Sequence, residues 1–337
     1  MTSPSIPTTE HLLEIVNRMD QVRVLLLADL VLDRFIVGRP SRISREAPVL
    51  ILQQEDDLLT AGGGGNAAVA AAVLNAQVCV AGALGSDAEG DSLLGVLQEF
   101  SVDTSLVQCL EAYQTPTKTR VVGHGTHAMP QQIVRFDREG TVPNGIVLPE
   151  LTDKVDLVLV SDYGYGAATP EILASLQASL ESDVPTLVDS RYRLAQYSGI
   201  TGATPNQEEV ERIFDASIED QPVDAAHRLR RQLDCQHLLL TRGSEGMILA
   251  LNSGTAKIPV HGGSQVADVT GAGDTVMAAY GVALAAGAEP LAAALIANYA
   301  GGVVVTKAGT ATVDRSELNA AIKSDPEPIS QLQWLDL

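Results

Sequence analysis

The sequence has little cysteine, few aromatic residues and no apolar run long enough to cross a membrane. Its 337 residues include only Cys79, Cys109 and Cys235, too few and too widely spaced for a disulfide framework or a zinc cluster, so we expect buried thiols. Apolar runs stay below the roughly 20 residues that a membrane-spanning helix needs. Residues 1–10 lack the basic start and apolar core of a secretion signal. These absences predict a cytoplasmic protein with no membrane partner.

Basic residues are also scarce, since 22 Lys and Arg face 42 Asp and Glu, giving a formal net charge of −20. A nucleic-acid-binding protein needs basic clusters that neutralise phosphates, and no basic run occurs, so we exclude nucleic acid as a partner. The six histidines show no metal-ligand spacing. Only 4% of residues are aromatic whereas alanine and glycine abound, which favours close packing of helices on a sheet.

Predicted strands and helices alternate along most of the chain. Val22–Ala28 is a nearly continuous apolar run of strand length, typical of a strand buried on both faces of a sheet. The other predicted strands are 78–81, 157–160, 186–188 and 237–241, and the predicted helices are 12–19, 63–74, 91–100, 170–180, 208–214, 223–233 and 275–286. This alternation predicts an α/β fold with a mostly parallel sheet.

Two segments interrupt the alternation. Residues 34–52 and 106–136 alternate apolar and polar side chains, which predicts short antiparallel strands in a small second sheet. Such a sheet can act as a lid that excludes water from a reactive site. We therefore divide the chain into an N-terminal tail with a short helix (1–20), one domain that carries the lid (21–323), and a C-terminal tail without an assigned role (324–337).

The most informative motif is Asp268–Thr275, in which small residues precede Asp274 at the start of a predicted helix. The amides of Gly271, Ala272 and Gly273 can converge on an anion, and the helix N-terminus adds partial positive charge. A neighbouring carboxylate can accept the proton of a hydroxyl that attacks a phosphate. We expect the helix N-terminus to lower the pKa of Asp274. The alternative is a glycine-rich turn whose aspartate caps the helix.

A second glycine run, Ala61–Asn66, precedes another predicted helix. Its glycines, among them Gly62 and Gly63, would let the backbone approach a ligand, and Asn66 can donate and accept hydrogen bonds to hydroxyls. Asp33, shortly after the first strand, is a further candidate for binding a hydroxyl. The alternatives are a flexible turn with a helix cap and an ordinary loop aspartate.

Further patterns suit a nucleotide and a metal ion. Asn206 and Glu209 share one side of a predicted first helical turn, where they could organise Mg²⁺-bound water, although the same spacing also forms a capping box. Leu240–Gly246 follows a strand and could cradle a nucleotide phosphate or form a hairpin turn. Asp189 ends a strand at the edge where open α/β sheets bind ligands, and Ser161–Tyr163 does so one strand earlier.

Two familiar phosphate-binding motifs are absent from the sequence. Neither a Walker-type loop nor a dinucleotide-binding glycine motif after the first strand occurs. His124–His127 superficially resembles a nucleotidylyltransferase motif, but its glycine is displaced and its flanks are typical of a hairpin in the lid. We do not assign that activity.

In this order the motifs resemble those of the ribokinase-like (PfkB) carbohydrate kinases over nearly the whole chain. Stretches similar to the kinase module of D-glycero-β-D-manno-heptose 7-phosphate kinases are Leu32–Phe35, Ser41–Val49, Thr117–Arg120, Ile133–Asp137, Leu159–Tyr163, Asp268–Val276, Ala297–Val305 and Lys307–Thr310. The resemblance implies a three-layer α/β/α sandwich with a small β-sheet lid. It also implies a kinase that uses ATP and Mg²⁺ to convert a sugar phosphate, most closely the heptose 7-phosphate, to the 1,7-bisphosphate.

The resemblance also implies a role for each matching residue. Asp274 would be the general base, with Gly271, Ala272 and Gly273 as the anion hole. The residues that would bind the sugar phosphate are Asp33, Gly62, Gly63, Asn66, Arg120 and Arg135. The residues that would bind the nucleotide are Asn206, Thr241, Gly243, Gly246, Asn298, Lys307 and Gly309. The residues that would organise Mg²⁺ are Asp189, Asn206 and Glu209.

The chain departs from the family pattern where Ser190–Arg191 replace Pro-Lys and where Tyr165 replaces Lys. The basic residues on the predicted lid that could bind a distal phosphate, or remain solvated surface charges, are Arg42, Arg45, Lys118, Arg120 and Arg135. Three functions stay open: a heptose-phosphate kinase, a ribokinase-like kinase for another sugar or sugar phosphate, and a catalytically weak nucleotide- or sugar-binding protein. Apolar residues in 35–37 and 49–52 permit a homodimer through the lid.

Overall fold

Two sheets organise the chain in the computed structural model, which describes residues 5–124, 131–149, 154–181, 183–262 and 266–336. The large sheet has the strand order β14-β13-β12-β11-β10-β9-β8-β1-β4-β5. Its strands are β1 (Arg23–Ala28), β4 (Gln77–Gly85), β5 (Asp103–Leu110), β8 (Leu157–Asp162), β9 (Thr186–Ser190), β10 (Gly202–Ala203), β11 (His237–Thr241), β12 (Met247–Leu251), β13 (Gly254–Ile258) and β14 (Gln333–Leu335). The interior strands β4, β1, β8 and β9 pair in parallel, as predicted.

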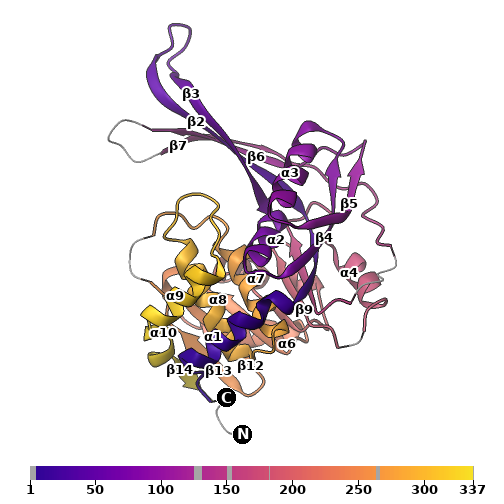
Figure 1. The fold of residues 1–337 in the computed structure, drawn as a ribbon, viewed down its shortest axis with the longest axis vertical. Coiled ribbons are helices and arrows are strands. Elements are labelled where there is room, and N and C mark those ends of the chain that lie inside the picture. Colours follow the sequence, from indigo (N-terminus) through magenta and orange to yellow (C-terminus); the bar gives the residue numbers. More distant parts are fainter. Residues whose placement is uncertain (1–4, 125–130, 150–153, 182, 263–265, 337) are drawn as a thin grey trace.

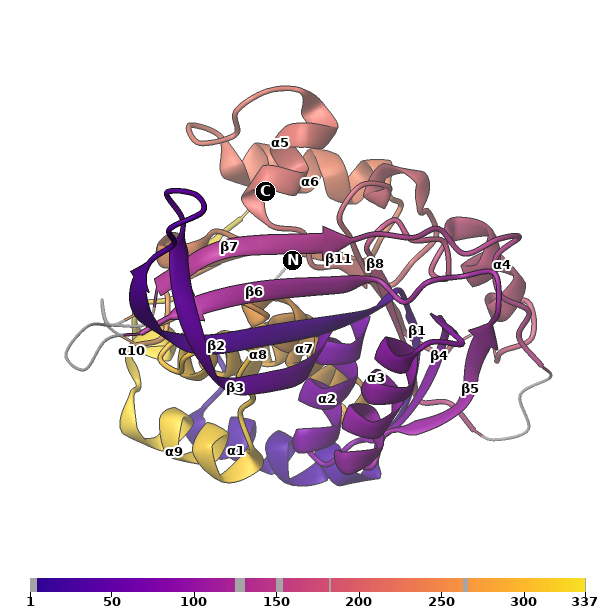
Figure 2. The ribbon, with the colours of Figure 1, turned by 90° about the horizontal axis from the view of Figure 1, so that it is seen from above.

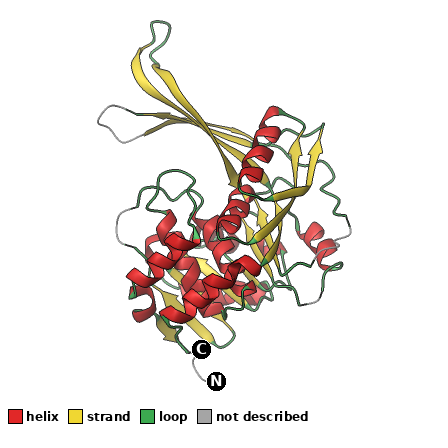
Figure 3. Cartoon of the chain, viewed as in Figure 1, coloured by secondary structure: helices red, strands yellow, loops and turns green. Residues whose placement is uncertain are grey.

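Helices cover both faces of the large sheet, which gives three layers (Figures 1 and 3). They are α1 (Thr9–Arg18), α2 (Gly64–Val73), α3 (Ala88–Glu99), α4 (Pro170–Gln177), α5 (Gln207–Phe214), α6 (Pro222–Gln232), α7 (Ala272–Ala285), α8 (Pro290–Val304), α9 (Arg315–Ser324) and α10 (Glu327–Ser330). Strand β1 shows why: Val24 and Leu26 belong to one apolar cluster and Leu25 and Leu27 to the other. Alternate side chains point to opposite faces, so an apolar run fills both cores.

The two cores are built by different helices. One contains apolar residues of α1, α2, α7, α8 and α9, including the buried Tyr280 and Tyr299. The other contains residues of α4 and α6. Seen from above, α1 and α9 lie on one side of the small sheet and α5 and α6 on the other (Figure 2). The predicted α/β fold is confirmed.

The small sheet has the order β3-β2-β6-β7 and projects from the body of the molecule (Figure 1). Its strands are β2 (Leu30–Ile43), β3 (Leu50–Gly63), β6 (Thr117–Gly123) and β7 (Gln131–Arg138). The predicted boundaries were wrong in two places, because the first segment continues to Gly63 and residues 106–110 belong to β5 of the large sheet. Strand β5 is half-buried at the sheet edge, so it alternates apolar and polar residues as a lid strand does.

The lid also differs from the prediction in its pairing and at one motif. Strands β2 and β6 pair in parallel rather than antiparallel. Of the His124–His127 pattern, residues 125–127 lie outside the described residues. His124 lies with its Nε2 2.6 Å from Glu55 Oε2 on β3.

Both chain ends join the same domain, which corrects the proposed tails. Leu12 and Ile15 of α1 are fully buried in the core. Strand β14 pairs with β13 and so extends the large sheet. Because β14 is only three residues long, its sequence shows no periodicity from which a strand could be predicted. Cys109 is exposed, contrary to the expectation of buried thiols, because it lies on the edge strand β5. Within the described residues no helix is long and apolar enough to cross a membrane.

Candidate active site

Asp274 lies where the two glycine motifs meet. It stands in the first turn of α7 and its side chain is 6% exposed. Asn66 of α2 donates from Nδ2 to Asp274 Oδ2 at 2.9 Å, and the Tyr163 hydroxyl donates to Oδ1 at 3.2 Å. Tyr163 follows β8, so three separate segments position one carboxylate. The sequence prediction had placed Asn66 on substrate hydroxyls, whereas here it orients Asp274.

Burial raises the pKa of Asp274 to about 6, while the hydrogen bonds from Asn66 and Tyr163 act in the opposite direction. The expectation that the helix N-terminus would lower this pKa was wrong. A helix terminus contributes about 0.3–1 kcal/mol, whereas desolvation of a buried carboxyl can shift its pKa by several units. Asp274 is therefore ionised near neutral pH and is a stronger base than an exposed aspartate.

The turn before α7 depends on glycine at one position. Gly271 has φ +77°, and a Cβ there would lie 2.4 Å from Asn66 Nδ2. Gly273 has open space around it, with no atom within 4 Å of an added Cβ. The amide of Ala272 donates to the carbonyl of Val269 at 3.2 Å. This amide takes part in the turn, and the anion hole of three amides stays a prediction.

Asp33, Gly62 and Arg120 form one cluster at the base of the lid. Arg120 Nη1 lies 2.7 Å from Asp33 Oδ1, and both side chains are largely buried. A Cβ at Gly62 would lie 2.5 Å from Asp33 Oδ2, which explains the glycine. Gly63, with φ +55°, begins α2. The cluster is close enough to Asp274 for the negative charge of Asp33 to contribute to the raised pKa of that carboxyl.

A cavity of about 610 Å³ opens between the lid and the loop after β8. It is lined by Lys118, Arg135, Asp137, Glu139, Gly140, Thr141, Tyr163, Gly164, Tyr165, Arg191 and Tyr192; we call it the acceptor cavity. Tyr163 lines this cavity and also donates to Asp274, so one side chain joins the cavity wall to the carboxylate. Lys118 Nζ lies 5.1 Å from the centre of the Tyr163 ring. The exposed Arg42 and Arg45 lie outside its lining, near the tip of the β2–β3 hairpin.

The lid directs its charges to one face. Lys118 and Arg120 are two residues apart on β6, so they share a face. Arg135 of β7 pairs in register with Arg120, and Asp137 pairs with Lys118. Arg135 is held by Asp137, at 2.6 Å from Nε to Oδ1.

Two buried aspartates shape the loop that carries Tyr163 and Tyr165. The sequence analysis missed Asp29 and named Asp162 only within the stretch Ser161–Tyr163. Asp29, directly after β1, accepts the backbone amides of Tyr163, Tyr165, Ala167 and Ala168 at 3.0, 2.8, 2.8 and 3.2 Å. Burial raises the pKa of Asp29, while these amide hydrogen bonds lower it. Asp162 accepts hydrogen bonds from Ser190, Arg193 and Tyr197. Their only sequence signal was a carboxylate at the carboxyl end of a parallel strand.

A second cavity of about 610 Å³ lies at the N-terminus of α7. It is lined by Thr241, Gly243, Ser244, Gly246, Met247, Val260, His261, Gly262, Val266, Val269, Ala272, Gly273, Val276, Asn298, Gly301, Gly302, Val305 and Thr306; we call it the nucleotide cavity. Thr241, Gly243, Gly246 and Asn298 therefore lie together, as the prediction required. Because Gly273 lines it too, this cavity reaches the turn that carries Asp274.

Two residues predicted beside the nucleotide lie outside the described lining of this cavity. Lys307 Nζ pairs with Glu317 Oε1 at 2.6 Å and donates to the carbonyl of Thr312 at 2.7 Å. The amide of Gly309 donates to Asp268 Oδ2 at 3.1 Å. These contacts hold the loop after α8 against α9 and against the loop that contains Asp268. Both residues therefore have a structural role in this region.

Two of the three predicted metal residues, Asp189 and Glu209, are carboxylates, and together with Asn206 they form what we call the acidic group. Asn206 and Glu209 make a capping box on α5, each accepting the other's backbone amide at 2.9 Å, which was the alternative interpretation. Burial raises the pKa of Asp189 well above its ordinary value, and the charges of Glu209 and Asp274 add to this. An isolated parallel β-bridge pairs the backbone of Asn206 with that of Thr241, which lines the nucleotide cavity.

This acidic group fits a hydrated cation rather than one bound directly by several side chains. The described residues hold no set of three His, Cys, Asp or Glu side chains close enough to bind a metal. Mg²⁺ usually keeps several of its waters and takes few protein ligands. The mutual repulsion of Asp189, Glu209 and Asp274 is what a nearby cation would relieve.

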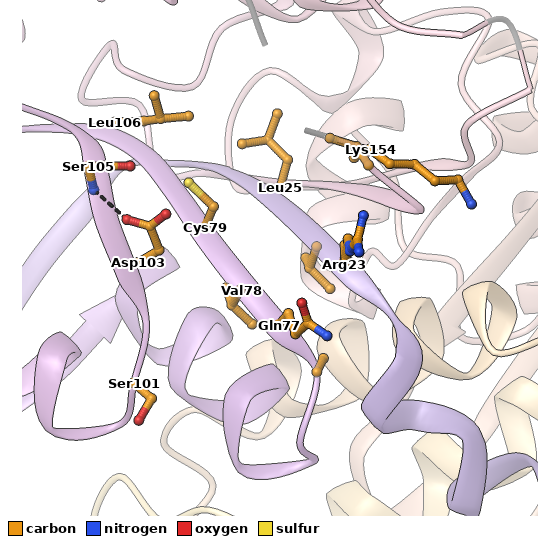
Figure 4. Close-up of a pocket in the computed structure, with 13 residues that line it drawn as sticks. Arg23, Leu25, Gln77, Val78, Cys79, Ser101, Asp103, Ser105, Leu106 and Lys154 are labelled. Atoms are coloured by element: carbon orange, nitrogen blue, oxygen red, sulfur yellow. Dashed lines mark hydrogen bonds between the residues drawn. The ribbon is translucent and has the colours of Figure 1, made fainter. Parts of the chain in front are cut away.

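A third hollow, of about 680 Å³, lies at the opposite ends of the strands (Figure 4). Arg23, Gln77 and Asp103, which begin β1, β4 and β5, line it together with Lys154. Asp274 lies at the carboxyl ends of these strands, so a ligand in this hollow could not reach it. We assign no part of the site to it.

Comparison with known proteins identifies the family. Residues 30–317 match the profile described as pfkB family carbohydrate kinase. The chain belongs to this family. It is 36% identical over 318 residues to the "Bifunctional protein HldE" of Methylobacillus flagellatus and 39% identical over 310 residues to that of Geobacter metallireducens. These alignments cover 90% and 88% of this chain but only 64% and 62% of the relatives, so the chain spans less than two thirds of their length.

Solved structures show the same fold. Arabidopsis thaliana ribokinase complexed with ribose and ATP superposes with a TM-score of 0.70 at 20% identity, covering 90% of this chain and 99% of the ribokinase. Phosphofructokinase-2 from Escherichia coli gives a TM-score of 0.68 at 18% identity, covering 90% and 98%. The predicted ribokinase-like fold is confirmed. The chain is a sugar kinase, an enzyme that transfers a phosphoryl group to a hydroxyl.

Proposed function

We propose that this protein is an ATP- and Mg²⁺-dependent kinase of a sugar phosphate, with D-glycero-β-D-manno-heptose 7-phosphate as the substrate and the 1,7-bisphosphate as the product. One observation carries the proposal. The carboxylate of Asp274 lies next to the walls of two cavities, following Gly273 of the nucleotide cavity and bonded to Tyr163 of the acceptor cavity; glycine and aliphatic residues dominate the first wall and charged side chains the second. A nucleotide fits the first cavity and an anionic sugar fits the second.

The proton transfer follows from the position of Asp274. The acceptor hydroxyl approaches from the acceptor cavity and gives its proton to Asp274 as it attacks the terminal phosphate. Asn66 and Tyr163 hold the two carboxylate oxygens, so the base needs little reorientation. The helix N-terminus and the amide of Gly273 face the developing charge on the phosphoryl group. Mg²⁺ near Asp189 and Glu209 would offset phosphate charge.

A phosphorylated acceptor is favoured by the charges of the acceptor cavity. Its lining holds three cations, Lys118, Arg135 and Arg191, against two carboxylates, Asp137 and Glu139, so positive charge is in excess there although the net charge of the protein is −20. Burial lowers the pKa of Lys118, the charge of Asp33 acts in the opposite direction, and the charges of Arg191 and Arg135 lower it further. A phosphate dianion between these groups would relieve both effects, because charge-assisted hydrogen bonds from Arg and Lys suit phosphate oxygens.

A kinase for a different sugar phosphate is the second candidate, and a specific observation favours it. Tyr165 and Arg191 line the acceptor cavity at the two positions where the heptose kinases have lysine. A guanidinium is planar and binds in a fork, whereas an ammonium is a compact point charge. The exchange changes the shape that the distal end of the sugar must match, while leaving Asp274 and the nucleotide cavity intact.

ATP turnover against a panel of sugar phosphates and their unphosphorylated counterparts tests the proposal. We expect turnover with heptose 7-phosphate and at least 100-fold weaker turnover with free heptose. Turnover with another sugar phosphate would favour the second candidate. Thermal stabilisation by sugar phosphates without any ATP turnover would contradict a kinase and support a catalytically weak binding protein instead.

The lid also favours a homodimer. Apolar side chains of β2, β3, β7 and the β2–β3 connection are 44–61% exposed: Ile43, Val49, Leu58, Ile133 and Phe136. An apolar surface of this kind is commonly covered by a partner. We expect a dimer in light scattering at micromolar concentration and a monomer for Phe136→Ser; a wild-type monomer would contradict the homodimer.

A further inference from the structure

The C-terminal segment reaches the nucleotide cavity through one side-chain hydrogen bond. Asp325, directly after α9, lies with its Oδ2 2.6 Å from Nδ1 of His261. His261 lines the nucleotide cavity and takes no part in the phosphoryl transfer described above. The carbonyl of Asp325 also accepts the hydroxyl of Tyr299 at 2.6 Å. A segment without an assigned role therefore contributes to the wall of a binding cavity.

The position of His261 is fixed from three sides. Its ring packs against Tyr299 of α8, with ring centres 4.7 Å apart at an interplanar angle of 54°. A Cβ at Gly302, one turn along the same helix, would lie 2.6 Å from the His261 carbonyl oxygen and 2.8 Å from Cδ2. Glycine at 302 thus leaves the room that the imidazole occupies. With Asp325 on its third side, His261 has little freedom to move.

The imidazole is an unusual group in this cavity. Most of the lining is glycine or aliphatic, and the amide of Asn298 is already used by the carbonyl of Pro259 at 2.9 Å. When Nδ1 donates to a carboxylate, the neutral ring presents Nε2 as an acceptor. An acceptor here suits a purine that carries an exocyclic amino donor, and it disfavours one that carries a carbonyl at the same position.

We infer that His261 binds the base of the nucleotide and selects adenine over guanine, and that Asp325 of the C-terminal segment positions it. This inference rests on the proposed function only in taking a purine nucleotide as the occupant of the cavity. His261 would act through Nε2 and the face of its ring, and Asp325 would act through His261. Selectivity would then depend on a residue more than 60 positions away in the sequence.

Calorimetric titration of the full chain with MgATP and MgGTP tests this inference without requiring turnover. We expect His261→Asn, whose amide can still reach Asp325, to lose about 10-fold in ATP affinity and to bring the ATP and GTP affinities close together. His261→Gln, which places an amide near the former Nε2, should recover part of the preference. Asp325→Ala should lose a few-fold in ATP affinity.

The controls separate this inference from the proposed function. Asp336→Ala removes another carboxylate of the C-terminal segment, one that accepts from Trp334 Nε1 at 2.9 Å, and should bind ATP as wild type does. Wild-type binding with an unchanged ATP preference in His261→Asn would overturn the inference alone. Wild-type protein that binds neither nucleotide would overturn the inference together with the proposed kinase.

Discussion

The two cavities beside Asp274 have equal volumes and opposite chemistry. The nucleotide cavity is walled by glycine, valine and backbone, whereas the acceptor cavity is lined by charged side chains that come largely from the lid. Backbone can bind any triphosphate, because its amides are the same in every sequence. Side-chain charges can match only one arrangement of anions. The comparison indicates that the body of the fold supplies the chemistry and the lid supplies most of the selectivity.

The strongest way to break this comparison is to remove the carboxylate that lies next to the walls of both cavities. Asp274→Asn should lower kcat by about 100-fold or more, since a general base contributes that much, while nucleotide and sugar phosphate still bind. Ionised Asp274 destabilises the fold, because its raised pKa means that the folded state favours the protonated form. The variant should therefore melt no lower than wild type at pH 8. Near-normal turnover would remove Asp274 from this role.

The next test asks whether the acceptor cavity alone recognises the distal phosphate. Lys118→Ala should raise KM for the sugar phosphate by about 10-fold or more and leave KM for ATP unchanged, since a charge-assisted contact is lost. Arg45→Ala removes a cation from the exposed part of the lid and serves as the matched control. Equal effects of the two substitutions would show that general electrostatics, rather than the cavity, attracts the substrate.

A substitution in the nucleotide cavity should give the opposite pattern. Gly246 has φ +76°, and a Cβ there would lie 2.1 Å from the carbonyl oxygen of Ile258. Gly246→Ala should destabilise the fold by about 1–3 kcal/mol and raise KM for ATP several-fold. Gly95→Ala, in α3 with no atom within 4 Å of the added Cβ, should leave both quantities unchanged or improve stability slightly. A rise confined to KM for the sugar would contradict the assignment of the two cavities.

The smallest expected effect concerns Tyr163, which lines the acceptor cavity and donates a hydrogen bond to Asp274. Activity should fall as pH drops through about 6, because Asp274 must be ionised to accept a proton. The hydrogen bond from Tyr163 lowers the pKa of Asp274, so Tyr163→Phe should move this acidic limb of the kcat profile upward by a fraction of a pH unit. Tyr165→Phe, a matched loss of a hydroxyl, should leave the limb in place. A downward shift would contradict the role of Tyr163.

The sequence predicted the fold and the glycine motifs well because both depend on local patterns. The continuous apolar run Val22–Ala28 predicted a strand buried on both faces. The glycines before Asn66 and Asp274 predicted turns that other residues cannot form. The short strand β14 and the edge strand β5 were missed or misassigned, because three residues show no period and an edge strand alternates as a lid strand does.

Contacts between distant segments could not be predicted in the same way. Nothing near Asn66 in the sequence shows that its amide orients Asp274, or that Lys307 is held by Glu317. The pKa of Asp274 was predicted in the wrong direction because burial is a property of the assembled core. Asp29 was missed because its partners lie more than 130 residues along the chain.

The central claim is that a nucleotide and a sugar phosphate meet at Asp274 from the two cavities. A crystal structure with a non-hydrolysable ATP analogue, Mg²⁺ and the sugar phosphate tests it most directly. We predict the terminal phosphate beside the amide of Gly273, the attacking hydroxyl within hydrogen-bonding distance of Asp274, and the distal phosphate between Lys118 and Arg191. A triphosphate bound elsewhere, or a sugar whose hydroxyls all lie beyond the reach of Asp274, would contradict the account.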